Sequence, residues 1–254
     1  MRAFKAEAET NRKAWNRVAK RFGGVCALPD WGLFGECAGD DLLGPLEGKT
    51  VLEIGCGSGH SLAKVAQTKA DRIYGLDFSS AALAMASELN QDEIASGRVT
   101  LIEAPMEQDL GLRNVDVAFS IQAIGWTLEP AQVFENVASY LKPGGRFVWS
   151  WGHPLFGKVQ YQDGNLCVRD SYFNDAVWRE EGWSDAEAAY MVTRPISAWF
   201  AHLTDAGFLV RGYLEPRPER ISSAPQDPAR YYSQAKLKVL PCTMIFICEL
   251  PLGR

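Results

Sequence analysis

The residues with the clearest chemistry lie in the stretch VLEIGCGSGHSLAKVA, which runs from Val51 to Ala66. The stretch has the pattern of a buried strand, a glycine-rich turn and the start of a helix. Its glycines let the backbone turn tightly and approach a ligand closely. Glu53, two residues before the first glycine, places a carboxylate at the end of the strand. Because this carboxylate would repel a pyrophosphate and attract an ammonium group, the turn favours a cationic ligand.

Two further features describe this ligand. The turn departs from the G-x-G-x-x-G spacing of dinucleotide-binding proteins, which hold a pyrophosphate at the helix N-terminus. Asp77 closes the next strand about 20 residues after the glycines, where a carboxylate can accept hydrogen bonds from both ribose hydroxyls. S-adenosylmethionine fits these features, since it carries an α-ammonium, a sulfonium and a nucleoside. The alternative is that Glu53 is a solvated strand end and Asp77 caps the following helix.

Strands and helices alternate through most of the chain, which is typical of parallel strands joined by crossover helices on both faces. Short apolar strands are predicted at residues 51–55, 72–77, 99–104, 115–121, 146–151, 208–214 and 243–250. Helices are predicted at residues 12–22 and 58–67, and from Ser79 (a helix cap), Pro130 and Pro195. We therefore expect an α/β, Rossmann-like, doubly wound sheet of seven mostly parallel strands.

The alternation breaks between Gly152 and Arg194, where aromatic residues recur without clear periodicity. We interpret this stretch as a cap inserted after the fifth strand. Its rings indicate an apolar or aromatic substrate, although some of them could instead form a small core packed on the sheet. The expected division is an N-terminal helical lid (1–48), an S-adenosylmethionine-binding core (49–151), the cap (152–194) and the C-terminal part of the sheet (195–254).

The segments VLEIGCGSGH, GLDFS, VDVAFSIQAIGW and LKPGGRFVWSW resemble the class I S-adenosylmethionine-dependent methyltransferases. Within this class they look most like the small-molecule group related to quinone-biosynthesis methyltransferases. The resemblance covers about Lys49–Trp151 well and the remainder loosely. The cofactor contacts that it implies are Glu53, Gly55, Gly57, Ser58, Asp77, Phe78, Ser79, Pro105, Met106, Glu107, Ser120, Ile121, Gln122 and Trp31.

The resemblance also assigns roles along the cofactor. Glu53 and the first two glycines would line the methionine end, Asp77 would bind the ribose, and Phe78 would lie beside the adenine. In the family, an aspartate after the third strand often accepts from the adenine amine, but Pro105 occupies that position here. Glu107 is the alternative acceptor, and the backbone N–H of Met106 can still serve adenine N1. The segments around Trp15 and Trp31 would close over the cofactor, with core packing as the alternative for Trp15.

The segment after the fourth strand, SIQAIGW, indicates the class of nucleophile. It is neither the D/N-P-P-Y of amino-DNA methylation nor the Pro-Cys of cytosine methylation, and it has no acid for Mg²⁺. We expect metal-independent, in-line methyl transfer to a small molecule, for which the protein mainly aligns the reactants and excludes water. His153 is the candidate general base, with a turn histidine beside Pro154 as the alternative. The candidate substrate contacts are Trp126, His153, Phe156 and Tyr161.

The composition of the 254-residue chain limits its partners and compartment. A net charge of -5 and the lack of a Lys/Arg run argue against binding to nucleic acid. The six cysteines form no C-x-x-C pair, so they fit reduced thiols better than disulfides or zinc ligands. The polar N-terminus lacks the apolar core of a signal peptide, and no apolar run is long enough to span a bilayer. We expect a cytoplasmic protein, either monomer or homodimer, that binds no membrane.

Two other classes of function stay open at this point. A nicotinamide-dependent oxidoreductase would share the fold, but Glu53 and the glycine spacing argue against it. A non-catalytic protein that binds S-adenosylmethionine would have the same cofactor residues, because methyl transfer itself needs few side chains.

Overall fold

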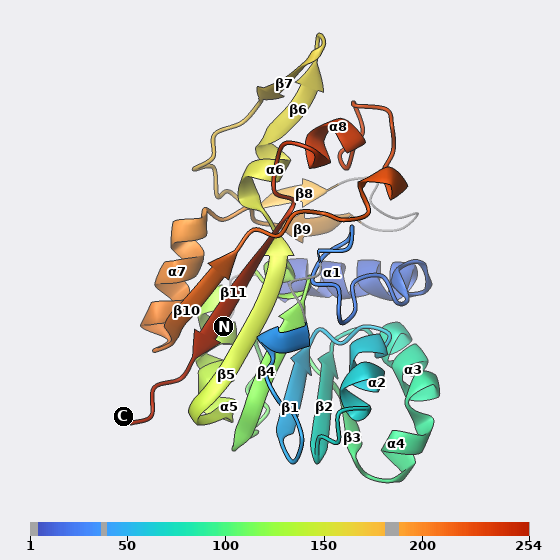
Figure 1. The fold of residues 1–254 in the computed structure, drawn as a ribbon, viewed down its shortest axis with the longest axis vertical. Coiled ribbons are helices and arrows are strands. Elements are labelled where there is room, and N and C mark those ends of the chain that lie inside the picture. The colour runs from blue at the N-terminus through green and yellow to red at the C-terminus, as the bar shows by residue number, and fades with distance from the viewer. Residues whose placement is uncertain (1–4, 37–39, 181–187, 254) are drawn as a thin grey trace.

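A seven-stranded sheet forms the centre of the molecule, a computed structural model in which residues 5–36, 40–180 and 188–253 are described (Figure 1). The strand order is β10-β11-β5-β4-β1-β2-β3. Neighbouring strands are parallel, except that β11 runs antiparallel to both β5 and β10. The strands of this sheet are β1 (Thr50–Ile54), β2 (Arg72–Asp77), β3 (Val99–Glu103), β4 (Val115–Ile121), β5 (Leu141–Gly152), β10 (Leu209–Leu214) and β11 (Thr243–Glu249).

Helices cover both faces of this sheet, and one helix lies across the ends of its strands (Figure 1). The α-helices are α1 (Lys5–Val18), α2 (His60–Ala66), α3 (Ser80–Leu89), α4 (Gln91–Ala95), α5 (Pro130–Tyr140), α6 (Pro154–Lys158), α7 (Ile196–Asp205) and α8 (Gln234–Leu237). Short 3₁₀ helices are η1 (Ala19–Phe22), η2 (Asp40–Leu42), η3 (Ile124–Trp126) and η4 (Ile221–Ser223). Figure 1 shows α1 lying across the strand ends, above β1 and β2.

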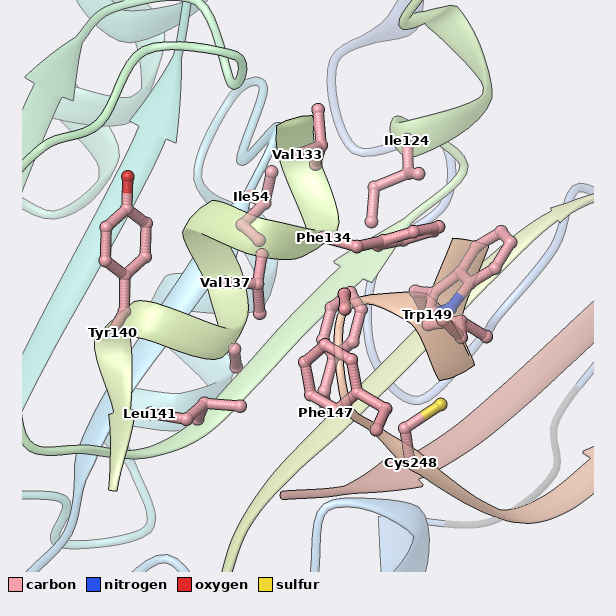
Figure 2. Packing of buried hydrophobic residues seen from close by; sticks show 14 of the residues in the cluster. Ile54, Ile124, Val133, Phe134, Val137, Tyr140, Leu141, Phe147, Trp149 and Cys248 are labelled. Atoms are coloured by element: carbon pink, nitrogen blue, oxygen red, sulfur yellow. The ribbon is translucent and has the colours of Figure 1, made fainter. Parts of the chain in front are cut away.

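Aromatic packing fixes the sheet against the helices on one face. The Trp149 ring of β5 stacks on Phe246 of β11 with centroids 4.8 Å apart, and it meets Trp199 of α7 at 5.0 Å. Phe134 of α5 lies 5.6 Å from Trp149, and Figure 2 shows these rings in one cluster with Phe147. Side chains as large and as fully buried as these each stabilise the fold by about 3 kcal/mol, so the strand ends that carry the site rest on a rigid base.

The prediction of a Rossmann-like, seven-stranded, mostly parallel sheet is confirmed, with differences at some element ends. The N-terminal helix begins at Lys5 rather than residue 12, because its first turns are polar and show no apolar face in the sequence. β5 begins at Leu141 rather than 146 because Leu141 already pairs with Val115, before a register shift that takes up the KPGG segment. Ser79 caps α3 as predicted, since its hydroxyl accepts from the N–H of Ala82 at 3.2 Å.

The stretch between Gly152 and Arg194 contains α6 and two hairpins. One hairpin pairs β6 (Val159–Gln162) with β7 (Asn165–Val168), and it projects from the end of the molecule opposite α4 (Figure 1). The other pairs β8 (Trp178–Glu180) with β9 (Ala189–Met191) and lies against α1. Asn11 of α1 donates to the carbonyl of Tyr190 at 2.9 Å and accepts from its N–H at 2.7 Å. This second hairpin therefore supports α1 through an edge-strand contact.

Cys37, one of the six cysteines, and Trp183, an aromatic residue of the stretch between Gly152 and Arg194, lie outside the described residues. Among the helices of the described part, none combines the length and apolar character that a bilayer crossing requires.

Candidate functional site

A cavity of about 1540 Å³ lies at the carboxyl ends of the parallel strands. On the sheet side its lining comes from the ends of β3, β2, β1, β4 and β5 and the segments that follow them, in the order of the strands across the sheet; α1 and the residues after it also line the cavity. This edge is where open α/β sheets bind ligands. Of the predicted cofactor contacts, the lining contains Glu53, Gly55, Gly57, Ser58, Asp77, Phe78, Ser79, Pro105, Met106, Glu107, Ile121 and Gln122.

Glu53 is the most unusual residue of this lining. It is 3% exposed at the end of β1, and burial raises the pKa of its carboxyl well above 4.5. A hydrogen bond from Ser61 lowers this pKa in part, while the nearby charge of Asp77 raises it further. Oxygen Oε2 of Glu53 has no hydrogen-bond partner in the described residues. A buried carboxylate oxygen without a partner is costly in a folded protein, so the site is complementary to a ligand that donates there, such as an ammonium group.

The glycine turn has one closed side and one open side. A Cβ on Gly55, whose φ is +71°, would lie 2.2 Å from the Cβ of Ala123, so this residue must be glycine for β1 to approach the segment after β4. A Cβ on Gly57, whose φ is +50°, would meet nothing within 4 Å. The open side faces the cavity, and a ligand can therefore approach the backbone closely at Gly57.

Asp77 ties the glycine turn to the start of α3. One oxygen accepts from the N–H of Gly57 at 2.9 Å, and the other accepts from the N–H of Ser79 at 2.8 Å. Burial raises the pKa of Asp77, although these backbone hydrogen bonds lower it in part. Because each carboxylate oxygen can accept a second hydrogen bond, Asp77 can hold the turn in place and still accept from hydroxyls in the cavity.

A side-chain pair joins the segment after β3 to the segment after β4. The hydroxyl of Thr127 donates to Oε1 of Glu107 at 2.5 Å, and both residues line the cavity. The side-chain amide of Asn136, from α5, donates to the carbonyl of Met106 at 3.3 Å. These contacts fix the backbone of the segment and the direction of the Glu107 carboxylate.

The segment after β4 approaches the glycine turn with a strained residue. Gln122 has a φ of +52°, which is rare for a residue with a side chain and is found disproportionately at functional sites. Its side-chain amide donates to the carbonyl of Trp31 at 3.2 Å. Two predicted contacts lie beneath the lining rather than in it. Ser120 is fully buried and donates to the carbonyl of Ile54 at 2.8 Å, and the Trp31 ring is packed in the core beside the sheet.

The N-terminal segment is attached to this site by polar contacts. The side-chain oxygen of Asn16, on α1, accepts from the Ser79 hydroxyl at 2.8 Å and from the N–H of Ala81 at 3.1 Å. After η1, the N–H of Gly24 donates to the Ser58 hydroxyl at 3.0 Å. The segment therefore covers the turn that would hold the cofactor.

An aromatic wall lies at the β4–β5 end of the cavity, and we define it as Trp15, Trp126 and Trp151. The centroids of Trp15 and Trp126 are 5.3 Å apart with their planes at 86°, and those of Trp126 and Trp151 are 5.8 Å apart at 77°. A Cβ on Gly125 would lie 1.7 Å from the Trp151 ring, so the glycine admits this ring. The sequence analysis predicted Trp126 as a contact but missed Trp151, although its place at the carboxyl end of β5 was a usable signal.

Three residues predicted in the substrate site do not line the cavity. Phe156 is buried in a small cluster with Leu237 and Cys242, and Tyr161 is 37% exposed on β6. His153 is buried at the start of α6, where its Nδ1 accepts from the N–H of Leu155 at 3.2 Å. Its Nε2 therefore carries the proton and donates to Glu215 at 3.0 Å. This placement fits the turn-histidine alternative from the sequence analysis. The other buried members of the cluster around Phe156 come from residues 224–242.

From the position of His153 we predict the effect of its replacement by alanine on cofactor affinity and on stability. Burial lowers its pKa, while the Glu215 carboxylate opposes this shift. His153→Ala should leave the affinity for S-adenosylhomocysteine unchanged and reduce the free energy of unfolding by about 1 kcal/mol through loss of the α6 cap, measured by calorimetry and thermal melting. If His153 were the general base, turnover would instead fall about a hundredfold, and the deficit would shrink as the pH rises.

Comparison with known proteins agrees with the geometry of this edge. Residues 52–149 match the model of the methyltransferase domain family. The chain is 32% identical over 107 residues to a tRNA U34 carboxymethyltransferase of Pseudoalteromonas translucida, which covers 41% of this chain and 32% of the relative. It is 27% identical over 107 residues to O-methyltransferase cnsE of Penicillium expansum, with 42% and 39% covered. The matched part thus spans only about a third of these curated relatives.

The fold is also found in solved structures. An S-adenosylmethionine-dependent methyltransferase from Mesorhizobium loti superimposes with a TM-score of 0.66 at 22% identity, covering 82% of this chain and 94% of that one. In the described part of the present chain, no group of three or more His, Cys, Asp or Glu side chains is arranged to hold a metal ion.

Proposed function

We propose that this chain, whose residues 52–149 match the methyltransferase domain family, is a class I S-adenosylmethionine-dependent methyltransferase that methylates a small apolar or aromatic molecule. S-adenosylmethionine, when bound, supplies a methyl group activated by its sulfonium centre. The proposal extends to metal-independent, in-line transfer. The observation that carries it is the partnerless carboxylate oxygen of Glu53 at the end of β1, beside the open face of Gly57.

The cofactor residues follow the order of the strands across the cavity. Glu53 would accept from the α-ammonium group, and Asp77, one strand further, would accept from the ribose hydroxyls. Pro105, Met106 and Glu107, beyond β3, would surround the base. A cofactor bound in this orientation would have its methyl group near β4 and β5, where Gln122 and the aromatic wall line the cavity.

The aromatic wall supports the assignment of substrate class. Aromatic rings favour contact with flat apolar groups, and each such ring–ring contact adds about 0.5–1.5 kcal/mol beyond area burial. The cavity also exceeds the ~300–1,000 Å³ of a single small-molecule pocket, which leaves room for a second ligand beside the cofactor. The chain's contribution would be to align the acceptor with the methyl group while α1 excludes water.

Charge supports a small molecule over a nucleic acid. Although some relatives modify tRNA, the described lining of the cavity contains seven Asp and Glu residues and three Lys and Arg residues. A polyanion entering this cavity would be repelled, whereas nucleic-acid sites carry an excess of cations. A small, neutral acceptor meets no such barrier.

Calorimetry with the purified protein tests this function. We expect S-adenosylmethionine and S-adenosylhomocysteine to bind at micromolar concentrations and NADH to bind negligibly. A methylation screen with isotope-labelled cofactor and apolar or aromatic acceptors should then identify turnover that EDTA leaves intact. NADH binding without S-adenosylhomocysteine binding would favour the oxidoreductase, and cofactor binding without any turnover would favour a non-catalytic protein.

A further inference from the structure

Tyr232 is a half-buried residue of the cavity lining that belongs neither to the cofactor contacts nor to the aromatic wall. It lies in the segment between β10 and β11, directly before Ser233, whose side chain caps α8 by accepting from the N–H of Lys236. The Tyr232 hydroxyl takes part in no hydrogen bond with the described residues. Because polar groups inside a protein are usually paired, this hydroxyl is available to a ligand in the cavity.

Three aromatic neighbours hold the ring of Tyr232 in place. The ring of Phe156 is stacked with it at 5.5 Å between centroids, Phe34 lies at 5.4 Å, and Tyr231 meets it edge-on at 4.7 Å. A phenylalanine would make the same ring contacts without bringing a hydroxyl to the apolar cluster around Phe156. The packing therefore accounts for the ring of Tyr232 but not for its hydroxyl.

Contacts along the sheet edge place Tyr232 at the acceptor end of the cavity. The first residue of β11 pairs with the last residue of β5, which directly follows Trp151. Just before β11, the thiol of Cys242 donates to Oε1 of the buried Glu36 at 2.6 Å. The other oxygen of Glu36 accepts from the N–H of Phe34 at 2.6 Å. Because the Phe34 ring contacts Tyr232, both cavity residues are tied to the strand ends beside the aromatic wall.

The surroundings of Tyr232 keep its hydroxyl protonated. Burial raises the pKa of this hydroxyl well above 10, and the neighbouring groups of Tyr231, Cys242, Cys26 and Glu36 raise it further. The carboxylate among these groups would also repel an anionic ligand. Tyr232 therefore offers an O–H donor at neutral pH, and its surroundings favour a neutral oxygen as the partner.

We infer that Tyr232 is a specificity-determining residue for the methyl acceptor, and that its hydroxyl donates to a neutral oxygen of the carbonyl class on a flat apolar ring system. This inference rests on the proposed function and defines its substrate class more closely. The aromatic wall would hold the ring system, and Tyr232 would determine which edge of it faces the methyl group. A molecule without the oxygen would bind less well, because it would leave the donor without a partner.

Two naphthalenes of nearly the same shape test this inference. 2-Acetylnaphthalene carries a carbonyl oxygen where 2-isopropenylnaphthalene carries a methylene group. Their affinities for the protein saturated with S-adenosylhomocysteine, measured by ligand-observed NMR titration, give one ratio for each variant. Tyr232→Phe keeps the ring and should lower the preference for the ketone about fivefold to thirtyfold relative to the wild type. Comparing ratios between variants removes the difference in hydrophobicity between the two probes.

The adjacent tyrosine provides the matched control. Tyr231 is 56% exposed and is not among the described residues that line the cavity. Tyr231→Phe removes the same hydroxyl group one residue away and keeps the ring that packs on Tyr232, so it should leave the ratio at the wild-type value.

The outcomes separate this inference from the function on which it rests. A wild-type protein that does not bind S-adenosylhomocysteine would overturn both. If it binds S-adenosylhomocysteine but neither naphthalene, or if Tyr232→Phe keeps the wild-type ratio or weakens both probes equally, the role of Tyr232 is overturned alone. If Tyr232→Phe fails to fold, the infrared carbonyl band of the ketone bound to the wild type decides instead. A band lowered from its position in alkane would support the hydrogen bond, and an unshifted band would overturn it.

Discussion

Replacing Glu53 by glutamine should weaken the binding of S-adenosylmethionine by about 2–4 kcal/mol, which is about thirtyfold to a thousandfold. The glutamine keeps the shape of the side chain and the contact with Ser61 but removes the charge that would face the α-ammonium group. The ligand-free variant should at the same time be more stable, by about 1–3 kcal/mol, because the wild type buries a carboxylate oxygen without a partner. Calorimetry gives the first quantity and thermal melting without ligand gives the second.

The difference in ligand-free stability between the wild type and Glu53→Gln should depend on pH in a definite direction. Burial raises the pKa of Glu53 in the folded protein above 4.5, so folding favours its protonated form. Its contribution to stability is fully present below about pH 4.5 and is lost as the pH rises through the raised pKa. The pKa of Asp77 is also raised, so its contribution to stability changes with pH in the same direction. Because Asp77 is present in both proteins, it does not affect the comparison. The ligand-free wild type and Glu53→Gln should therefore melt alike in acid and diverge as the pH rises, with the wild type less stable.

Two results would contradict this role of Glu53. If Glu53→Gln binds S-adenosylmethionine as tightly as the wild type, the carboxylate does not face the ammonium group. If the variant loses both affinity and ligand-free stability, Glu53 acts as a structural hydrogen-bond partner only. Glu88, an exposed acid on α3, is a suitable site for a control change to glutamine.

Replacing Trp126 by alanine should raise the KM for an aromatic acceptor about thirtyfold to a hundredfold, while the affinity for S-adenosylhomocysteine stays within about threefold. Trp126 is the central ring of the aromatic wall and contacts both Trp15 and Trp151. Its loss removes about 2–3 kcal/mol of apolar contact from the acceptor side of the cavity. Steady-state kinetics with an acceptor from the methylation screen would measure KM, and calorimetry would measure the cofactor affinity.

A matched control is available for the Trp126 experiment. Trp178 lies on β8, is 40% exposed and does not line the cavity, so Trp178→Ala should leave KM unchanged. Trp126→Phe should retain most of the acceptor affinity, because it keeps a ring at the centre of the wall. An equal loss of cofactor affinity in Trp126→Ala would mean that the ring belongs to the cofactor site, and an unchanged KM would remove the wall from the acceptor site.

Local sequence was enough to predict most of the sheet and the cofactor end of the cavity. Each strand contains a short apolar run that can be recognised in the sequence without help from tertiary contacts, and β1, β4 and β11 are buried on both faces. Glu53 and the glycines lie within a few residues of one another on a strand and the turn that follows it. Their relative geometry is thus fixed by backbone conformation. Asp77 is separated from them by one helix, and parallel pairing of β1 with β2 brings the two strand ends together.

Which residues lie at the acceptor end of the cavity depends on the tertiary structure. Trp151 and His153 are two residues apart and would share a face if the strand continued, but β5 ends at Gly152. The chain then turns so that His153 caps α6, while Trp151 stays against Gly125 in the cavity. Trp15 reaches the site through the packing of α1. Arg194, which is far from both Trp15 and the strand ends in the sequence, reaches it through hydrogen bonds to the carbonyls of Thr127 and Leu128. Contacts between segments so distant leave no periodic signal, because neither residue's neighbours in sequence determine which partner it meets.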